Sequence, residues 1–408
     1  MNSSILNKFF IVLIFFSFLF GLYIAITNSY GYDNDTYGML QTFINLKQKA
    51  EYFPSRIPGS PVAELGIGSL AWIGGSKLTN SFTLILFFSS LLFFPFIFKK
   101  SVNSTSYLPF LALCATSPLL LFENTHTMDY SWGLFFFTIG SFIKLRTKFN
   151  LFSIVFFALA IGSRFIYFIY IVPILLLNKN EKYNNKLSNR IFFLIFTLSF
   201  SASIYIIIWH QNNLFNYLFN TGIIMHKDFN WFGSISRFLY KNIMNFGLIQ
   251  SFIIAIFISY NLANIDKLMW IKKNNLLSML IIIFLNMIIF FKIPFEPMYL
   301  QISVISIYYI ISMGFELKNI NKILILVILS MNLFGWFKTI DILEISHEYN
   351  ERCTPVKALQ AKPNLFLNDG KYNWLEKNNK NVICYSKKFE DINGVDFSEK
   401  ILKGKSLR

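Results

Sequence analysis

The sequence predicts an all-α polytopic membrane protein that crosses the bilayer about eleven times. Of its 408 residues, 54% are hydrophobic and only 14% are charged, whereas a soluble domain carries about 25% charged residues. The apolar residues gather in runs that contain no charge, such as 9–26, 191–209 and 276–291. These runs approach the ~20 residues that cross a ~30 Å hydrocarbon core. Surface loops of a soluble protein do not explain them.

The polar segments between the runs alternate in charge, and this alternation orients the chain. The net charge is +16, but it does not indicate a nucleic-acid partner, because the basic residues gather in every second segment. The positive-inside rule places that set in the cytoplasm, with the N-terminus inside and the C-terminus outside. The set comprises Lys99, Lys100, Lys144, Arg146, Lys148, Lys179, Lys182, Lys186, Arg190, Lys267, Lys272, Lys273, Lys318 and Lys322.

The expected elements follow in order from these runs. The first run is long for a signal peptide and no small-residue cleavage site follows it, so we expect a retained helix at about 8–28. A large outside loop at about 29–79 comes next. Residues 1–343 form the predicted transmembrane domain, and the polar residues 344–408 form a small outside appendage. Further helices are expected near 80–98, 106–122, 130–146, 149–163, 164–178, 190–209, 242–262, 276–291, 298–315 and 322–340.

The first outside loop opens with two acids at the membrane surface, Asp33 and Asp35. An isolated Asp-x-Asp is often a solvated turn, but such carboxylates also serve as a general base or hold a divalent cation. Residues 36–53 then place apolar side chains at near-helical spacing, which predicts an amphipathic helix on the outer face. Residues 62–73 are too few to span the bilayer and are expected in or along the interface, as a second such helix.

Two arginines lie at outside positions. Arg56 precedes a sharp turn formed by the Pro-Gly-Ser-Pro of residues 58–61, and it pairs either with a phosphate or with Glu51. Arg164 falls between two helices that turn back at the outer surface. An arginine there either snorkels to the interface or binds a phosphate.

A second group of acids lies at the outside end of the third helix. Glu123, His126 and Asp129 fall within seven residues. Their spacing matches no zinc signature. Asp129 is therefore interpreted more economically as a second acid that lies close to the Asp33 region.

Two later outside segments add candidates. His226 and Lys227 lie among aromatic residues, a combination that suits sugar stacking and equally suits an interfacial belt. Lys292, Glu296 and Tyr299 lie in a proline-broken turn between two hydrophobic helices. Charged residues in a hydrophobic hairpin are hard to explain structurally, so this segment favours a functional role.

Taken together, these segments resemble those of C-type glycosyltransferases (GT-C) of the protein-mannosyltransferase and aminoarabinose-transferase kind. The resemblance covers about residues 1–340. Many relatives have adjacent acids, Asp-Glu, where this chain has Asp-x-Asp, so either Asp33 or Asp35 can be the base. The matching segments are residues 33–37 (DNDTY), residues 55–61 (SRIPGSP), Asp129, Arg164 and residues 294–300 (PFEPMYL).

The resemblance implies transfer of a sugar from a polyprenyl phosphate to a hydroxyl or amine of a lipid, glycan or protein acceptor. The reaction occurs on the extracytoplasmic face, most simply of a bacterial plasma membrane. An Asp takes the acceptor's proton, the anomeric carbon inverts, and a divalent cation is a candidate cofactor at Asp33 and Asp35. Arg164, Lys292 and Lys227 are the expected partners of the departing phosphate.

Two other classes of protein remain as alternatives. An O-antigen polymerase or ligase also uses outside arginines, but it would lack an acidic motif after the first helix and typically depends on a large late outside loop. A transporter or flippase is expected to show internal repeats and polar residues at mid-membrane, and we find neither in the sequence. Consumption of a monosaccharide carrier without energy input distinguishes the transferase from both.

The three cysteines divide between the two predicted regions. Cys114 lies inside an expected helix, where a small buried thiol is ordinary. Cys353 and Cys384 lie in the appendage, which the topology places outside. Because such compartments are oxidising, we expect these two to form a disulfide; two free thiols in a flexible tail are the alternative.

Overall fold

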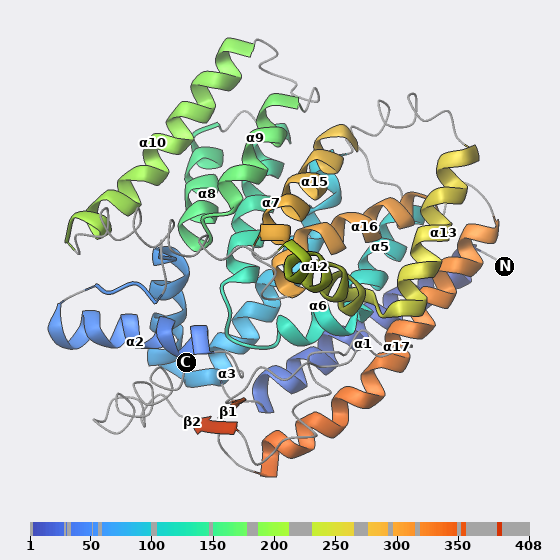
Figure 1. The fold of residues 1–408 in the computed structure, drawn as a ribbon, viewed down its shortest axis with the longest axis horizontal. Coiled ribbons are helices and arrows are strands. Elements are labelled where there is room, and N and C mark those ends of the chain that lie inside the picture. Colours follow the sequence, from blue (N-terminus) through green and yellow to red (C-terminus); the bar gives the residue numbers. More distant parts are fainter. Residues whose placement is uncertain are drawn as a thin grey trace.

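The computed structural model of the chain is built almost wholly of helices (Figure 1). It describes residues 3–27, 30, 34–50, 52–55, 59–98, 104–146, 150–177, 187–211, 231–264, 276–292, 297–314, 319–348, 352–355 and 382–385. The helices are α1 (Ser3–Thr27), α2 (Asn34–Lys49), α3 (Pro61–Phe93), α4 (Pro95–Phe98), α5 (Ser104–Thr116), α6 (Pro118–Glu123), α7 (Tyr130–Arg146), α8 (Asn150–Ser163), α9 (Tyr167–Leu177), α10 (Leu187–Gln211), α12 (Trp231–Phe246), α13 (Leu248–Asn264), α15 (Leu276–Lys292), the 3-10 helix η1 (Pro297–Leu300), α16 (Gln301–Gly314) and α17 (Asn319–Glu348).

The all-α class is confirmed, and a helix occupies each of the eleven segments in which one was expected. The apolar helices are compatible with a membrane protein. Within the described ranges, three helical stretches are long and apolar enough to cross a membrane: Ile5–Thr27, Pro61–Phe98 and Ser188–Ile206. Six apolar helices are shorter: Ser106–Thr116, Leu151–Ser163, Leu248–Tyr260, Leu277–Phe291, Met298–Met313 and Asn321–Gly335. Eleven crossings therefore stay a prediction.

Helix α3 begins at Pro61, much earlier than the helix expected near residue 80. Proline at a first helical position has the right φ and no N–H to satisfy, and Ser60 stands before it. The helix is interrupted at Gly74 and Gly75, and Gly75 has φ 62° and ψ −157°, a combination open only to glycine. The segment before this break covers the residues that were expected to lie along the interface.

A second difference concerns the segment around residue 240. One helix was expected over 242–262, after a loop. The structure has two helices instead, α12 and α13, separated by Gly247 at φ 76°. Helix α12 thus occupies part of the expected outside loop. Helix α17 also runs to Glu348, past the expected domain boundary at 343.

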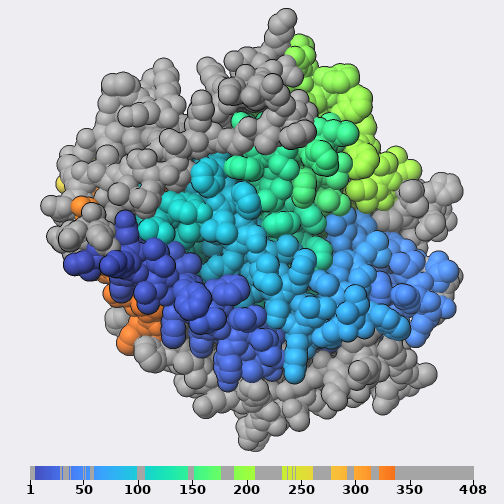
Figure 2. Space-filling model, turned by 180° about the vertical axis from the view of Figure 1, so that it is seen from behind, coloured from blue at the N-terminus to red at the C-terminus, as the bar shows by residue number. Residues whose placement is uncertain are grey.

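The helices share one apolar core, to which residues from α1 to α17 contribute. In Figure 1, α7, α8, α9 and α10 gather on one side, and α13, α17 and the start of α1 lie on the other. Seen from behind, α1 and α3 run beside each other at the surface (Figure 2). Large apolar side chains cover the outer sides of α1 and α10, as lipid-facing helices require; Phe15 and Phe192 are examples.

Neutral polar side chains join helices inside this bundle. Gln250 on α13 donates to Asn332 Oδ1 on α17 at 3.0 Å, and the amide nitrogen of Asn332 lies 3.2 Å from Thr116 Oγ1 on α5. Asn286 on α15 likewise donates to Ser303 on α16 at 2.7 Å. Sequence reasoning found no polar residues at mid-membrane, and the depth of these residues in a membrane stays untested. These groups bond to one another, as polar residues that hold membrane helices together do.

Two short strands follow α17. Strand β1 (Arg352–Pro355) pairs antiparallel with β2 (Val382–Tyr385), in a register that sets Cys353 opposite Cys384. The two cysteines expected to form a disulfide are thus direct cross-strand neighbours.

Candidate functional site

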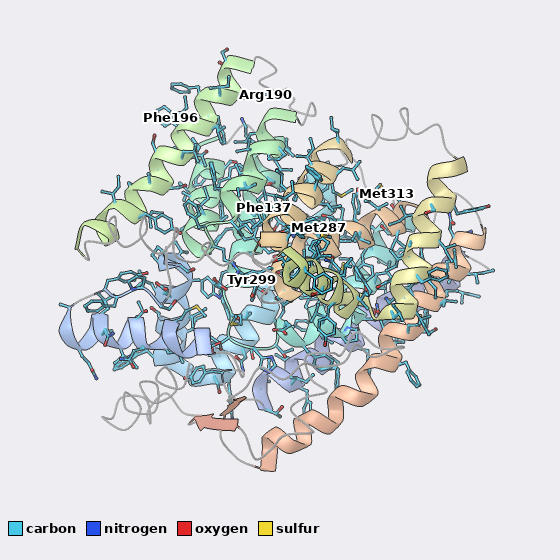
Figure 3. All side chains as sticks on the ribbon, viewed as in Figure 1. Phe137, Arg190, Phe196, Met287, Tyr299 and Met313 are labelled. Carbon is cyan, nitrogen blue, oxygen red and sulfur yellow. The ribbon has the colours of Figure 1, made fainter. Side chains whose placement is uncertain are left out.

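Three of the residues singled out in the sequence meet at the ends of different helices: Asp129, Arg164 and Tyr299. Asp129 immediately precedes α7, Arg164 lies between α8 and α9, and Tyr299 lies in η1. Figure 3 labels Tyr299 near the middle of the described side chains. Segments far apart in the chain therefore contribute to one cluster, which we call the Arg164 site (Ser60, Asp129, Tyr130, Arg164 and Tyr299). All of these residues are buried except Tyr299, which is half-buried.

Arg164 is held between two aromatic rings. Its Cζ lies 3.8 Å from the ring centroid of Tyr130 and 5.0 Å from that of Tyr299. Its Nε lies 3.7 Å from Asp129 Oδ2. A planar guanidinium stacks on aromatic faces while its donors remain directed to an anion. With only 8% of its surface exposed, Arg164 is a fixed buried cation and does not snorkel.

Local backbone chemistry places both members of this pair. The carbonyl of Asp129 accepts the bond from Gly133 N at 3.2 Å, so Asp129 stands at the start of α7, where acidic residues are favoured. Arg164 N donates to Ala160 O at 2.9 Å at the end of α8, where a cation is favoured. The helix ends thus bring opposite charges to one place.

The proline-rich turn also reaches this cluster. Ser60 Oγ lies 3.3 Å from Asp129 Oδ2, which connects the residue before α3 with the residue before α7. Asp129 is completely buried. Its carboxylate therefore has a polar partner from the 55–61 segment as well as the arginine, as a buried charge requires.

Helix α2 is tied to the loop that carries Asp129. Thr36 Oγ1 donates to Thr127 O at 2.7 Å, and Thr127 N donates to Tyr30 O at 2.9 Å. Thr127 Oγ1 in turn bonds to Asn80 Oδ1 on α3 at 2.6 Å. The start of α2, where the acidic motif ends, is thus fastened two residues away from Asp129.

A second buried acid holds the segment before the turn. Glu64 on α3 is completely buried and accepts hydrogen bonds from Ser55 N at 2.9 Å, from Ser55 Oγ at 2.5 Å and from Tyr52 OH. Burial, and then the nearby carboxylate of Glu64, raise the pKa of Tyr52 far above its usual value. This arrangement keeps residues 52–55 in place against α3.

The 3-10 helix is anchored from the other side. Gln301, the first residue of α16, lies with its Nε2 3.2 Å from Asn124 Oδ1, and Ser131 Oγ also donates to that oxygen. The loop before α7 is therefore joined to the chain two residues after Tyr299. Sequence reasoning missed five residues that build this site: Ser60, Glu64, Thr127, Tyr130 and Gln301. Polar and aromatic residues of this kind are common in the sequence, so nothing distinguishes them there.

The remaining candidates divide into two sets. Asp35 lies in the first turn of α2 and Lys292 ends α15, and only their backbones are described. Asp33, Arg56, His226, Lys227 and Glu296 lie outside the described residues.

The alternative metal site at Glu123, His126 and Asp129 is not formed. Among the residues that the structure describes, no group of three or more His, Cys, Asp or Glu side chains comes together. His126 Nδ1 instead lies 2.7 Å from the carbonyl of Phe122, one turn earlier. A cation at Asp33 and Asp35 stays a prediction.

Comparison with protein-family models, curated proteins and solved structures finds no match for this chain. Its function must therefore be argued from the site itself.

Proposed function

We propose that this chain is a membrane glycosyltransferase of the GT-C type. It would transfer a sugar from a polyprenyl-phosphate carrier to a lipid, glycan or protein acceptor on the extracytoplasmic face of a plasma membrane crossed about eleven times. The observation that carries the proposal is the Arg164 site, where a buried arginine lies between Tyr130 and Tyr299 beside a buried aspartate.

A lipid-linked phosphate is the kind of leaving group that such an arginine suits. As the bond between the anomeric carbon and the phosphate oxygen breaks, negative charge develops on that oxygen. A preoriented guanidinium stabilises this charge through charge-assisted hydrogen bonds, and it does so more strongly in a buried site than in water. Lys292, at the end of α15 just before η1, is the second cation that we assign to this phosphate.

The acid groups supply the other half of the reaction. We assign the base role to Asp33 or Asp35: its carboxylate takes the acceptor's proton while the acceptor oxygen or nitrogen forms the new bond to the anomeric carbon. Asp129 is the helper, because it already contacts Arg164. The bond from Thr36 to Thr127 supports this division, since it fastens the end of the acidic motif to the loop of Asp129.

The test compares two buried arginines in the purified protein, reconstituted in nanodiscs with labelled polyprenyl-phosphate hexoses. Arg164→Gln should lower kcat/KM for the donor by about 10²–10³-fold, the usual loss when a transition-state donor is removed, and should weaken use of the acceptor less. Arg190→Gln is the matched control, because Arg190 is also buried but lies on α10, well away from Tyr299 (Figure 3).

The outcomes separate the alternatives. Equal losses in both variants, or a loss shared equally between donor and acceptor, would show that Arg164 is structural. Failure of the wild type to consume any carrier without an energy source would favour a polymerase, a ligase or a transporter.

A further inference from the structure

Helix α12 carries an apolar stripe that the rest of the described chain leaves uncovered. Phe232, Ile235 and Leu239 are 82%, 44% and 55% exposed. Their spacing of three and four residues places them along one side of a helix. An exposed row of large apolar side chains on an amphipathic helix indicates a surface that contacts something other than water.

The neighbouring side of α12 is fixed to the protein. Phe238 packs against Phe290 and Phe291 near the end of α15, with ring centroids 6.0 and 5.7 Å apart. At the C-terminal end of α12, on the same side as the stripe, Phe246 is buried and its ring lies 5.5 Å from that of Tyr308 on α16. Helix α12 also contacts η1. Its orientation is therefore set by the protein, and the exposed stripe is a fixed surface.

Two features indicate that phospholipid covers this stripe. Beyond the break at Gly247, exposed apolar residues continue on the apolar helix α13, at Phe252 and Ile256. The stripe is thus followed directly by an apolar helix whose exposed side chains are also apolar. The charged residues of α12 are Arg237 and Lys241, both basic, and basic residues on an amphipathic helix suit lipid phosphates.

We infer that α12 lies in the membrane interface and that Phe232, Ile235 and Leu239 insert into the leaflet on the side of the Arg164 site. Helix α12 contacts η1, and η1 carries Tyr299 of the Arg164 site. The inserted helix is therefore in contact with the segment that contributes Tyr299 to the site.

The test measures depth with single labels and needs no activity. In a background of Cys114→Ala, Cys353→Ser and Cys384→Ser, an environment-sensitive fluorophore is attached to one introduced cysteine at a time. The labelled protein is placed in nanodiscs of phosphatidylcholine and phosphatidylglycerol that contain doxyl-labelled lipid. The positions compared are Phe232→Cys, Ile235→Cys, Leu239→Cys and, on the opposite side of the helix, Lys241→Cys.

Doxyl lipid should quench the first three labels about twofold or more beyond the label at position 241, because the apolar side of an interfacial helix lies roughly 5–10 Å deep. Aqueous iodide should show the reverse order. Equal quenching at all four positions, or iodide quenching strongest at 232, 235 and 239, overturns the inference. Three independent positions keep the test decisive if one variant does not fold.

Discussion

Glu64 shows at the residue scale how the fold accommodates a buried charge. Removing a carboxylate from water is costly unless hydrogen bonds replace the lost hydration. Here the backbone N–H and the hydroxyl of Ser55 and the hydroxyl of Tyr52 supply three such bonds. The sequence offered no signal for this, because a glutamate in a loop of mixed charge is expected to be solvated. Its role depends on a fold that brings residues 52 and 55 back onto α3.

The raised pKa of Tyr52 predicts a loss of stability in alkali. Such a tyrosine stays neutral in the folded state but ionises near pH 10 in the unfolded state. Its contribution to the free energy of unfolding is therefore complete below pH 10 and falls as the pH rises further. At about pH 11 the loss is roughly 1.4 kcal/mol. Thermal unfolding in detergent should therefore show a smaller alkaline loss for Tyr52→Phe than for the wild type. Tyr23→Phe, at an exposed position of α1, should match the wild type; a Tyr52→Phe curve parallel to the wild type would contradict the assignment.

The Arg164 site was only partly predictable at this scale. Asp129, Arg164 and Tyr299 were identified because charges and broken turns are unusual at helix ends in a membrane protein. Each also had an ordinary interpretation, and their meeting depends on how α7, α8 and α16 pack. Tyr130 and Ser60 could not be identified, since nothing in the sequence distinguishes them from other tyrosines and serines.

At the scale of the element, glycines at two positions interrupt what sequence periodicity predicts as continuous helix. Sequence periodicity predicts where a helix lies but not that Gly75 turns within it, or that Gly247 separates α12 from α13. Helix α12 was also missed in the sequence. Its polar residues lower the mean hydropathy by which an apolar helix is recognised. A separate short segment before Gly74 was predictable from its length, and the break at Gly74 and Gly75 ends it there. Its position along the interface stays a prediction.

Substitution at the α3 break should be costly. Gly75→Ala places a Cβ on a backbone with φ 62° and ψ −157°, which should destabilise the protein by about 1–3 kcal/mol. Ala50→Gly is the opposite control: Ala50 has φ 54° at the end of α2, where glycine is preferred, so that change should be neutral or stabilise by about 1 kcal/mol. Unfolding temperatures measured in one detergent compare them. Equal stability of Gly75→Ala and wild type would show that the break is not required.

For the whole molecule, composition and charge alternation were enough to predict an all-α membrane protein. They could not predict the amide contacts among α5, α13 and α17, because helix partners are chosen by packing that a single sequence does not reveal. The orientation of the chain is also a prediction, and the two cysteines of the appendage report on it.

The register of β1 and β2 predicts a disulfide between Cys353 and Cys384. Residues directly opposite in an antiparallel pair have Cα atoms about 4.5 or 5.5 Å apart, and both values fall within the range that a disulfide spans. A bridge closing about 30 residues contributes roughly 3–4 kcal/mol. Mass mapping without reductant should find the linked peptides, with buried Cys114 as the free-thiol control. Free thiols at both positions would count against the bridge and against an outside appendage, because a cytoplasmic one stays reduced.

The contact between Arg164 and Asp129 has a kinetic consequence under the proposed function. The arginine is already matched by a carboxylate 3.7 Å away, so an arriving phosphate competes with Asp129 for the same cation. When the phosphate takes that position, Asp129 loses its partner and becomes available to the acceptor. The proposed function therefore predicts that the carrier binds before the acceptor.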